Sequence, residues 1–141
     1  MTSKAYLTAI TRTSPSAPCR WIFENGLLVG KKLDYGCGKG FDADHYGMDK
    51  YDPHYFKTLP TSTYDTIVCT YVLNVISEPQ GEFILKMTKK LLNPGGNVYF
   101  TVRRDITKPR ISARGTFQRS VTLDLEILRE TSKFCIYHMP E

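Results

Sequence analysis

The sequence lacks any long apolar run. No stretch of its 141 residues approaches the roughly 18 consecutive apolar residues that a membrane-spanning helix needs. Residues 1–4 are polar and do not form the hydrophobic stretch of a secretory signal. We therefore expect a cytoplasmic protein with no membrane partner.

Cysteine and histidine are few and dispersed. The 4 cysteines contain no CxxC pair, and the 3 histidines lie at no spacing that would combine them with cysteine or a carboxylate. Neither a zinc site nor a disulfide framework follows from such a pattern, and we predict no metal. Cys37 differs from the others because it lies within a glycine-rich segment.

What is present is enough apolar material for one core. Hydrophobic residues make up 41% of the chain, and its length suits a single domain. Residues 1–18 are rich in Thr, Ser and Pro, so we expect an N-terminal arm followed by one domain over residues 19–141. The formal charge of +5 favours anions but identifies no partner.

Hydrophobic periodicity alternates between strands and helices along the chain. The pattern predicts strands at 31–35, 45–52, 65–71 and 97–102, and helices at 20–29 and 78–92. The segment 65–71 has a continuous apolar centre, which is typical of a strand buried in a parallel sheet. A strand, helix, strand succession with right-handed crossovers gives such a sheet.

The C-terminal region allows two interpretations. Alternating apolar residues at 121–127, followed by a strand at 134–139, favour an antiparallel hairpin. A helix over Thr122–Glu130 is the alternative, because Val121, Leu125 and Leu128 would share one helical face.

The glycine-rich segment follows the first predicted strand. Three glycines in five residues, Gly36, Gly38 and Gly40, let the backbone bend sharply and approach a ligand closely. Dinucleotide sites carry GxGxxG before a long helix, whereas here only a few residues precede the next strand. A glycine loop without a ligand is the alternative.

The pattern acidic-x-GxGxG from Asp34 resembles motif I of class I S-adenosylmethionine (SAM)-dependent methyltransferases. Residues 64–76 resemble motif IV of that family, and residues 91–100 its following helix end and strand. The resemblance implies an α/β, minimal Rossmann-like class I methyltransferase fold, with a mostly parallel sheet, and SAM as cofactor. The cofactor contacts it implies are Asp34, Gly36, Cys37, Gly38, Gly40 and Thr70.

A carboxylate at the end of the second strand would accept hydrogen bonds from the ribose hydroxyls of SAM. Asp52 is the first choice, because it is farther from the loop and directly precedes Pro53. Asp49 is the second choice. For either residue, the alternative is a solvated surface aspartate.

A narrower similarity links the chain to methyltransferases associated with DNA phosphorothioation. Its segments are residues 8–12, 26–28, 34–38, 51–53, 71–76 and 114–118. The present chain is shorter than that family. Only Phe41–Tyr46 replace the usual first helix, and residues 52–65 leave little room for a helix and a third strand. We therefore expect a weak cofactor pocket, or one completed by the N-terminal arm or by a second copy in a homo-oligomer.

The acceptor side is less defined. Tyr71 and Asn74 follow the strand where class I enzymes meet the acceptor, so they are the candidate catalytic residues. Alternatively, Tyr71 packs and Asn74 caps the next turn. The segment carries neither the [DNS]PP[YFW] sequence of amino-methylating DNA enzymes nor a Pro-Cys pair, which argues against ordinary base methylation.

A basic segment follows the last parallel strand. Six cations that could bind nucleic-acid phosphates lie within 17 residues: Arg103, Arg104, Lys108, Arg110, Arg114 and Arg119. A solvated basic loop is the alternative. We therefore expect a SAM-dependent methyltransferase that acts on a small molecule or a nucleic acid. The alternatives are an inactive SAM-binding accessory protein and a nucleic-acid-binding module on the same fold.

Overall fold

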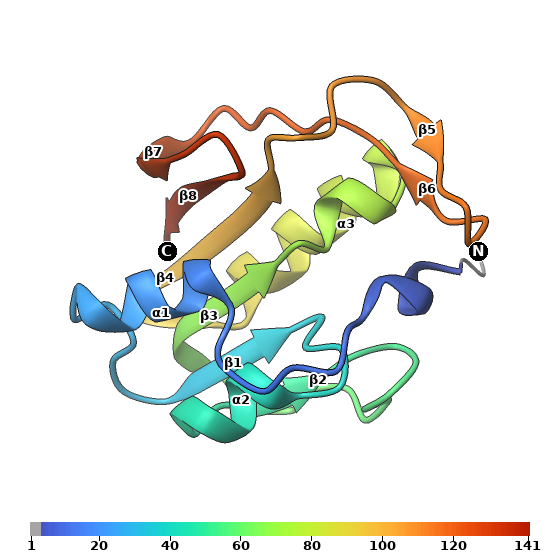
Figure 1. Ribbon diagram of the computed structural model, residues 1–141. Coiled ribbons are helices and arrows are strands. Elements are labelled where there is room, and N and C mark those ends of the chain that lie inside the picture. The colour runs from blue at the N-terminus through green and yellow to red at the C-terminus, as the bar shows by residue number, and fades with distance from the viewer. Residues whose placement is uncertain (1–3) are drawn as a thin grey trace.

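A computed structural model describes residues 4–141, so the first three residues of the predicted arm lie outside it. Figure 1 shows one six-stranded sheet with helices on both faces. Its spatial order is β2 (Asp49–Tyr51), β1 (Lys32–Tyr35), β3 (Tyr64–Thr70), β4 (Leu92–Arg103), β8 (Phe134–Pro140) and β7 (Glu126–Glu130). The first four strands in this order are parallel to one another, and β8 is antiparallel to both of its neighbours, β4 and β7. This arrangement confirms the predicted fold class.

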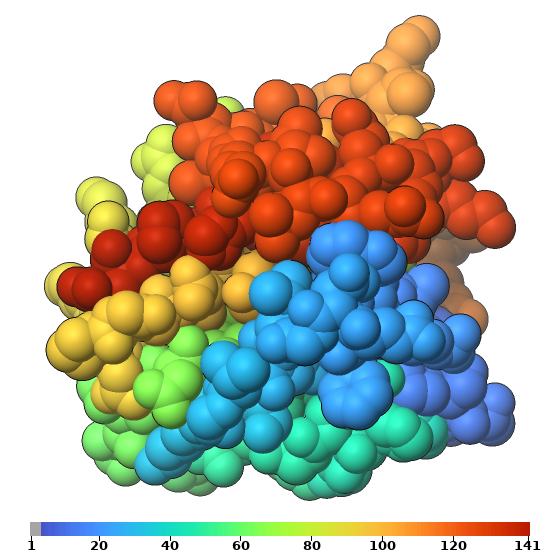
Figure 2. All heavy atoms as spheres, turned by 90° about the vertical axis from the view of Figure 1, so that its left-hand side faces the viewer, coloured from blue at the N-terminus to red at the C-terminus, as the bar shows by residue number. Residues whose placement is uncertain are grey.

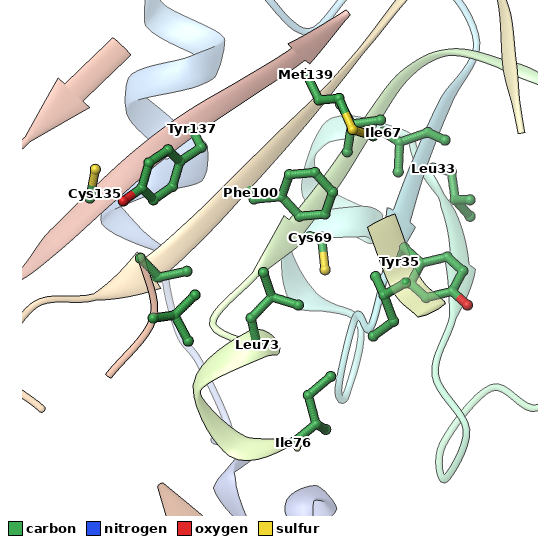
Figure 3. Packing of buried hydrophobic residues seen from close by; sticks show 14 of the residues in the cluster. Leu33, Tyr35, Ile67, Cys69, Leu73, Ile76, Phe100, Cys135, Tyr137 and Met139 are labelled. Atoms are coloured by element: carbon green, nitrogen blue, oxygen red, sulfur yellow. The ribbon is translucent and has the colours of Figure 1, made fainter. Parts of the chain in front are cut away.

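Side-chain alternation along the strands separates two cores. Ile67 and Cys69 of β3 pack in the cluster that includes Ile84 of α3 (Glu78–Lys90). Val68 packs in the other cluster, with Ile22 of α1 (Ala17–Glu24). Figure 3 shows the first cluster continuing across Phe100 and Tyr137 of β4 and β8. The result is a helix, sheet, helix layering.

Local sequence signals explain both long helices. Ser16 caps α1 by accepting from the Cys19 amide, and Pro18 lies in the first turn, where a missing N–H is tolerated. Ser77 and Gln80 form a capping box at the start of α3. In Figure 2, α1 lies between the C-terminal strands and α2 (Phe41–Tyr46).

The C-terminal hairpin is confirmed, and the alternative helix over Thr122–Glu130 is wrong. Strand β7 begins at Glu126, later than the alternation suggested. It forms a strand and not a helix because it pairs with β8, where Ile127 lies opposite Tyr137. A two-stranded hairpin of β5 (Arg110–Ile111) and β6 (Phe117–Gln118) stands apart from the main sheet.

The second strand is shorter than predicted. Residues 45 and 46 belong to α2, which ends at Gly47 in a left-handed conformation, so β2 spans only Asp49–Tyr51. After β2, residues 52–63 form turns and one isolated bridge, between Asp52 and Phe56. This segment therefore contains neither a helix nor a strand, as its length suggested.

Within residues 4–141, no helix has the length and apolar character to cross a membrane. A cytoplasmic location stays a prediction.

Candidate cofactor site

A cavity of about 1180 Å³ lies at the carboxyl edge of the parallel strands. Such edges are where open α/β sheets bind ligands. Most of the predicted cofactor residues line it, namely Asp34, Gly36, Cys37, Gly38, Gly40, Asp52 and Thr70. Its other walls come from the N-terminal segment, from the turn η2 (Leu73–Val75) and from the start of α3.

The glycine loop is fixed to the end of β2. The amides of Gly36 and Cys37 both donate to the Tyr51 carbonyl, at 2.7 and 3.0 Å. Gly36 has φ +84°, and a Cβ there would lie 2.4 Å from Cγ2 of Val72. Only glycine fits this position, because both the backbone conformation and the approach of the β3 end exclude a side chain.

Asp52 is the central acceptor of the loop. Its Oδ2 accepts from the Gly38 amide at 2.8 Å, and its Oδ1 accepts from the amides of His54 and Tyr55 at 2.9 and 3.1 Å. A carboxylate offers about four acceptor positions, so one remains for a ligand hydroxyl. Asp52 therefore lies at the strand end predicted for the ribose contact.

Asp49 does not lie at the site. It is the first residue of β2, opposite Leu33 in β1, and its carboxylate accepts from the Tyr64 hydroxyl at 2.7 Å. This places it toward the amino edge of the strand and outside the cavity lining. The second choice for the ribose contact therefore has the wrong position.

Asp34 is a buried carboxyl with an unsatisfied oxygen. Its side chain is 4% exposed, and its Oδ1 has no hydrogen-bond partner among the described residues. Burial, followed by the charges of Asp42 and Asp52, raises the pKa of Asp34 well above its usual value. Thr70 also has a buried hydroxyl without a partner. Such groups are costly unless a ligand satisfies them.

Asp42 is a site residue that the sequence analysis missed. Its carboxylate accepts from the amide and hydroxyl of Ser16, at 2.9 and 2.6 Å, and it lines the cavity. The only available signal was an acidic residue two positions after Gly40. Together, Asp34, Asp42 and Asp52 give this half of the cavity an acidic character.

Tyr71 directly follows β3 and lines the cavity. Within residues 4–141 it is the one non-glycine residue with a positive φ, +61°, and its amide donates to the Thr101 carbonyl at 2.8 Å. Strained backbone of this kind is often found at functional sites. Burial raises the pKa of the Tyr71 hydroxyl, although Arg12 and Arg103 lower it, so the group is protonated at neutral pH.

Asn74 has a structural position. It is fully buried, its amide nitrogen donates to the Arg119 carbonyl at 2.9 Å, and its Oδ1 accepts from the Arg103 amide at 2.7 Å. It is not part of the cavity lining. The structure therefore separates it from the candidate acceptor side, because both ends of its side chain are used to join η2 to the end of β4 and to the backbone of Arg119.

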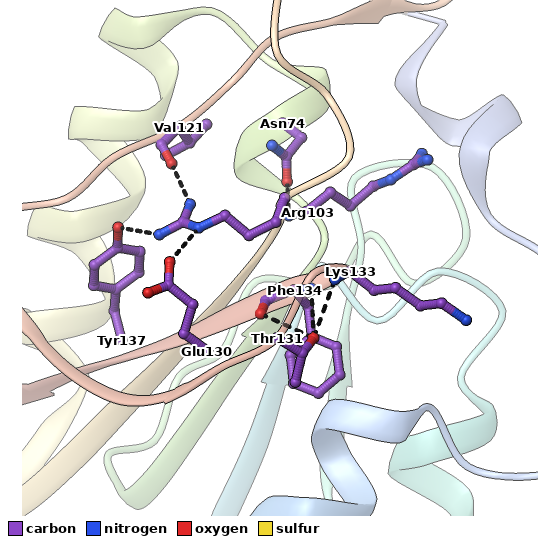
Figure 4. A network of polar contacts seen from close by, with 9 residues as sticks. Asn74, Arg103, Val121, Glu130, Thr131, Lys133, Phe134 and Tyr137 are labelled. Atoms are coloured by element: carbon purple, nitrogen blue, oxygen red, sulfur yellow. Dashed lines mark hydrogen bonds and ion pairs between the residues drawn. The ribbon is translucent and has the colours of Figure 1, made fainter.

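The predicted basic segment is largely occupied by internal contacts. The Arg104 guanidinium donates to the Glu130 carboxylate, to the Val121 carbonyl and to the Tyr137 hydroxyl. Figure 4 labels these three partners. The other engaged side chains are Arg103 on Asp105, Arg110 on Gln118, Arg114 on the Leu7 carbonyl and Arg119 on the Ile76 carbonyl. Lys108 alone of the six has no side-chain partner among residues 4–141. Nucleic-acid binding stays a prediction.

The N-terminal segment forms a wall of the cavity. In Figure 1 it passes beside the arrowheads of β1 and β3, and η1 (Ala5–Thr8) lies within it. Tyr6 stacks on His54 with ring centroids 3.8 Å apart, and the Lys39 ammonium donates to Thr11 at 3.0 Å. Arg12 lines the cavity as well; it ends the segment 8–12 of the narrower resemblance, which assigned it no role at the site.

No protein-family model and no curated protein sequence matches the chain. Solved structures do. A DhpI–SAH complex is 14% identical with a TM-score of 0.62, covering 88% of this chain and 83% of its own. A SAM-dependent methyltransferase from Mesorhizobium loti is 12% identical with a TM-score of 0.56, and the match covers 87% of this chain and 98% of that methyltransferase. The glycopeptide N-methyltransferase MtfA in complex with SAM is 11% identical with a TM-score of 0.51, and the match covers 94% of this chain and 72% of MtfA. The chain therefore has the class I methyltransferase fold.

Proposed function

We propose that the chain binds SAM at the carboxyl edge of its sheet and transfers the methyl group to an acceptor in the same cavity. The observation that supports this most strongly is Asp34: a buried carboxyl with an unsatisfied oxygen, beside two further carboxylates and a glycine loop. A cationic ligand with hydroxyl donors suits such a set, and SAM carries a sulfonium, an ammonium and two ribose hydroxyls.

The ribose, the cationic part and the carboxylate of the cofactor each have a matching group. Asp52 at the β2 end would accept from the ribose, and Asp34 and Asp42 would face the cationic part. Arg12 has no hydrogen-bond or ion-pair partner among the described residues, and its neighbour Thr11 contacts Lys39 of the glycine loop. Arg12 is therefore the candidate partner of the cofactor carboxylate.

The chain's own contribution to the reaction would be positioning. SAM, when bound, supplies an electrophilic methyl group on a positively charged sulfur. Methyl transfer needs the acceptor lone pair in line with that methyl, and holding two reactants in this geometry accelerates the step. Tyr71 carries a protonated hydroxyl at the cavity wall, so it would donate a hydrogen bond to the acceptor and would not remove a proton.

Isothermal titration of the purified chain with SAM and with S-adenosylhomocysteine (SAH) tests cofactor binding. Turnover of methyl-labelled SAM with small-molecule and nucleic-acid acceptor pools tests catalysis. We expect binding of both and transfer to at least one pool. Absence of SAM and SAH binding would refute the function.

A second candidate is a SAM-binding accessory protein without activity. The absence of helix and strand in residues 52–63 favours it, because that side of the cofactor is covered mainly by turns. Binding of SAM without transfer to any pool would support this candidate. An acceptor in DNA, as the narrower resemblance implies, and a homo-oligomer are further proposals, which the nucleic-acid pool and the oligomeric state in solution test.

A further inference from the structure

Three carboxyl groups and two cations of the cavity lie at different ends of the sheet edge. Asp34, Asp42 and Asp52 lie at the β1 and β2 end. At the β4 and β8 end, Arg103 is the last residue of β4, and Lys133 directly precedes β8. Because β8 is antiparallel to β4 and pairs Phe134 with Arg103, the two cations come to the same edge.

The backbones that carry these cations are fixed, while their charged groups face the cavity. The Arg103 amide donates to Asn74, and the Lys133 carbonyl accepts from the Arg104 amide at 2.9 Å. Figure 4 shows the Arg103 and Lys133 side chains extending in the same direction, away from the Arg104 contacts. The Lys133 ammonium has no partner within the described part of the chain.

One carboxylate opposes this positive end. Asp105 accepts from Nε and Nη2 of Arg103 at 2.9 and 2.5 Å, with its side chain 49% exposed. This pair holds the guanidinium at the cavity wall. The pair itself is neutral, so the excess positive charge comes from Lys133, and an incoming anion would compete with Asp105 for the guanidinium.

We propose that Arg103 and Lys133 form a subsite for the acid group of a small organic anion, the methyl acceptor. The assignment rests on the proposed function. It places the acceptor at the Arg103 and Lys133 end of the cavity, with Tyr71 between the acceptor and the acidic half. Arg12, beside the glycine loop, is left for the cofactor carboxylate. A small molecule fits better than nucleic acid, because the N-terminal segment walls the cavity and the neighbouring arginines are engaged internally.

Titration with matched probes tests the subsite. Benzoate, phenyl phosphate and uncharged benzamide are titrated into the chain saturated with SAH, and again into the chain without SAH. We expect at least one anion to bind at least tenfold more tightly than benzamide, and its affinity to fall as salt increases. Anions that bind no better than benzamide would overturn the subsite.

Substitutions identify the residues. Arg103→Met and Lys133→Met should each weaken anion binding at least fivefold and change the SAH affinity less than threefold. Asp105→Asn should tighten anion binding, because it removes the competing carboxylate. Lys86→Met, on the exposed face of α3, is the matched control and should have no effect. Unchanged anion affinity in both cation variants would also overturn the proposal.

The remaining outcomes separate the two proposals. If SAH fails to bind but the anion binds through Arg103 and Lys133, the methyltransferase function fails and the anion subsite stands. If an oligonucleotide binds through these residues while both small anions fail, the ligand is a nucleic-acid phosphate, and the small-molecule assignment is wrong.

Discussion

The carboxylate of Asp52 accepts a hydrogen bond from the backbone amide of Gly38 at 2.8 Å, and this bond joins the end of β2 to the glycine loop after β1. Two sequence motifs that lie 14 residues apart thus form one surface. The same carboxylate both shapes the loop and faces the cavity, so its removal should affect folding and cofactor binding together.

Asp52→Ala should weaken SAH binding at least tenfold, which corresponds to about 1.4 kcal/mol or more. The physical reason is the loss of both the ribose acceptor and the loop contact. Calorimetric titration measures the effect. Asp49→Ala is the control, since Asp49 lies outside the cavity, and it should bind SAH as the unmodified chain does. Equal losses in the two variants would contradict the assignment.

Gly36→Ala should lower the free energy of unfolding by roughly 2–4 kcal/mol, because a Cβ at φ +84° is strained and would overlap with Val72. Gly47→Ala separates these causes: its φ is +68°, but no atom lies within 4 Å of the added Cβ. Gly47→Ala should lower the free energy of unfolding by about 1 kcal/mol. Urea unfolding measures both. A Gly36→Ala cost no larger than the Gly47→Ala cost would show that the contact with Val72 does not matter.

Ser16→Ala should destabilise the chain by about 2–3 kcal/mol, because the hydroxyl both caps α1 and donates to the buried carboxylate of Asp42. Ser77→Ala removes a cap from α3 without removing a hydrogen bond from a buried carboxylate, and should cost about 1 kcal/mol. Thermal or urea unfolding compares them. Similar costs would mean that the Ser16–Asp42 contact adds nothing to the cap.

Asp34→Asn should alter the pH dependence of stability. Burial raises the pKa of Asp34 in the folded chain, so the folded state holds this proton more tightly than the unfolded chain does. The stability linked to this proton is full below the unfolded pKa, about 4, and is lost as the pH rises through the higher folded pKa. The variant should therefore gain stability relative to the unmodified chain between pH 4 and 8. A constant difference across that range in urea unfolding would refute this prediction.

Tyr71→Phe should lower turnover roughly 10- to 100-fold while changing the SAH affinity less than threefold, because only the hydroxyl that orients the acceptor is removed. The aromatic ring keeps its packing. Since burial raises the Tyr71 pKa, the lost group is a donor, and the pH profile of the remaining activity between pH 6 and 8 should keep its shape. A change in the profile within that range would indicate a proton-transfer role for this hydroxyl.

The sequence by itself determined the fold class and the position of the glycine loop. The continuous apolar centre of residues 65–71 predicted a buried parallel strand, and the three glycines after Asp34 predicted a close backbone approach. These features are local: burial on both faces requires apolar residues at every position, and a positive φ favours glycine. The preference for Asp52 over Asp49 followed from its position at the end of the strand, and Asp52 does line the cavity, whereas Asp49 does not. The ribose contact itself stays a prediction.

Only the tertiary structure decided which other side chains join the cavity. Asn74 looked like a polar residue at an acceptor site, but its side chain is hydrogen-bonded to the backbones of Arg103 and Arg119. Arg12, Asp42 and Lys133 enter the cavity from segments up to 121 positions apart, counting from residue 12 to residue 133. No local spacing encodes these neighbours, because strand order and the antiparallel return of β8 bring them to one edge.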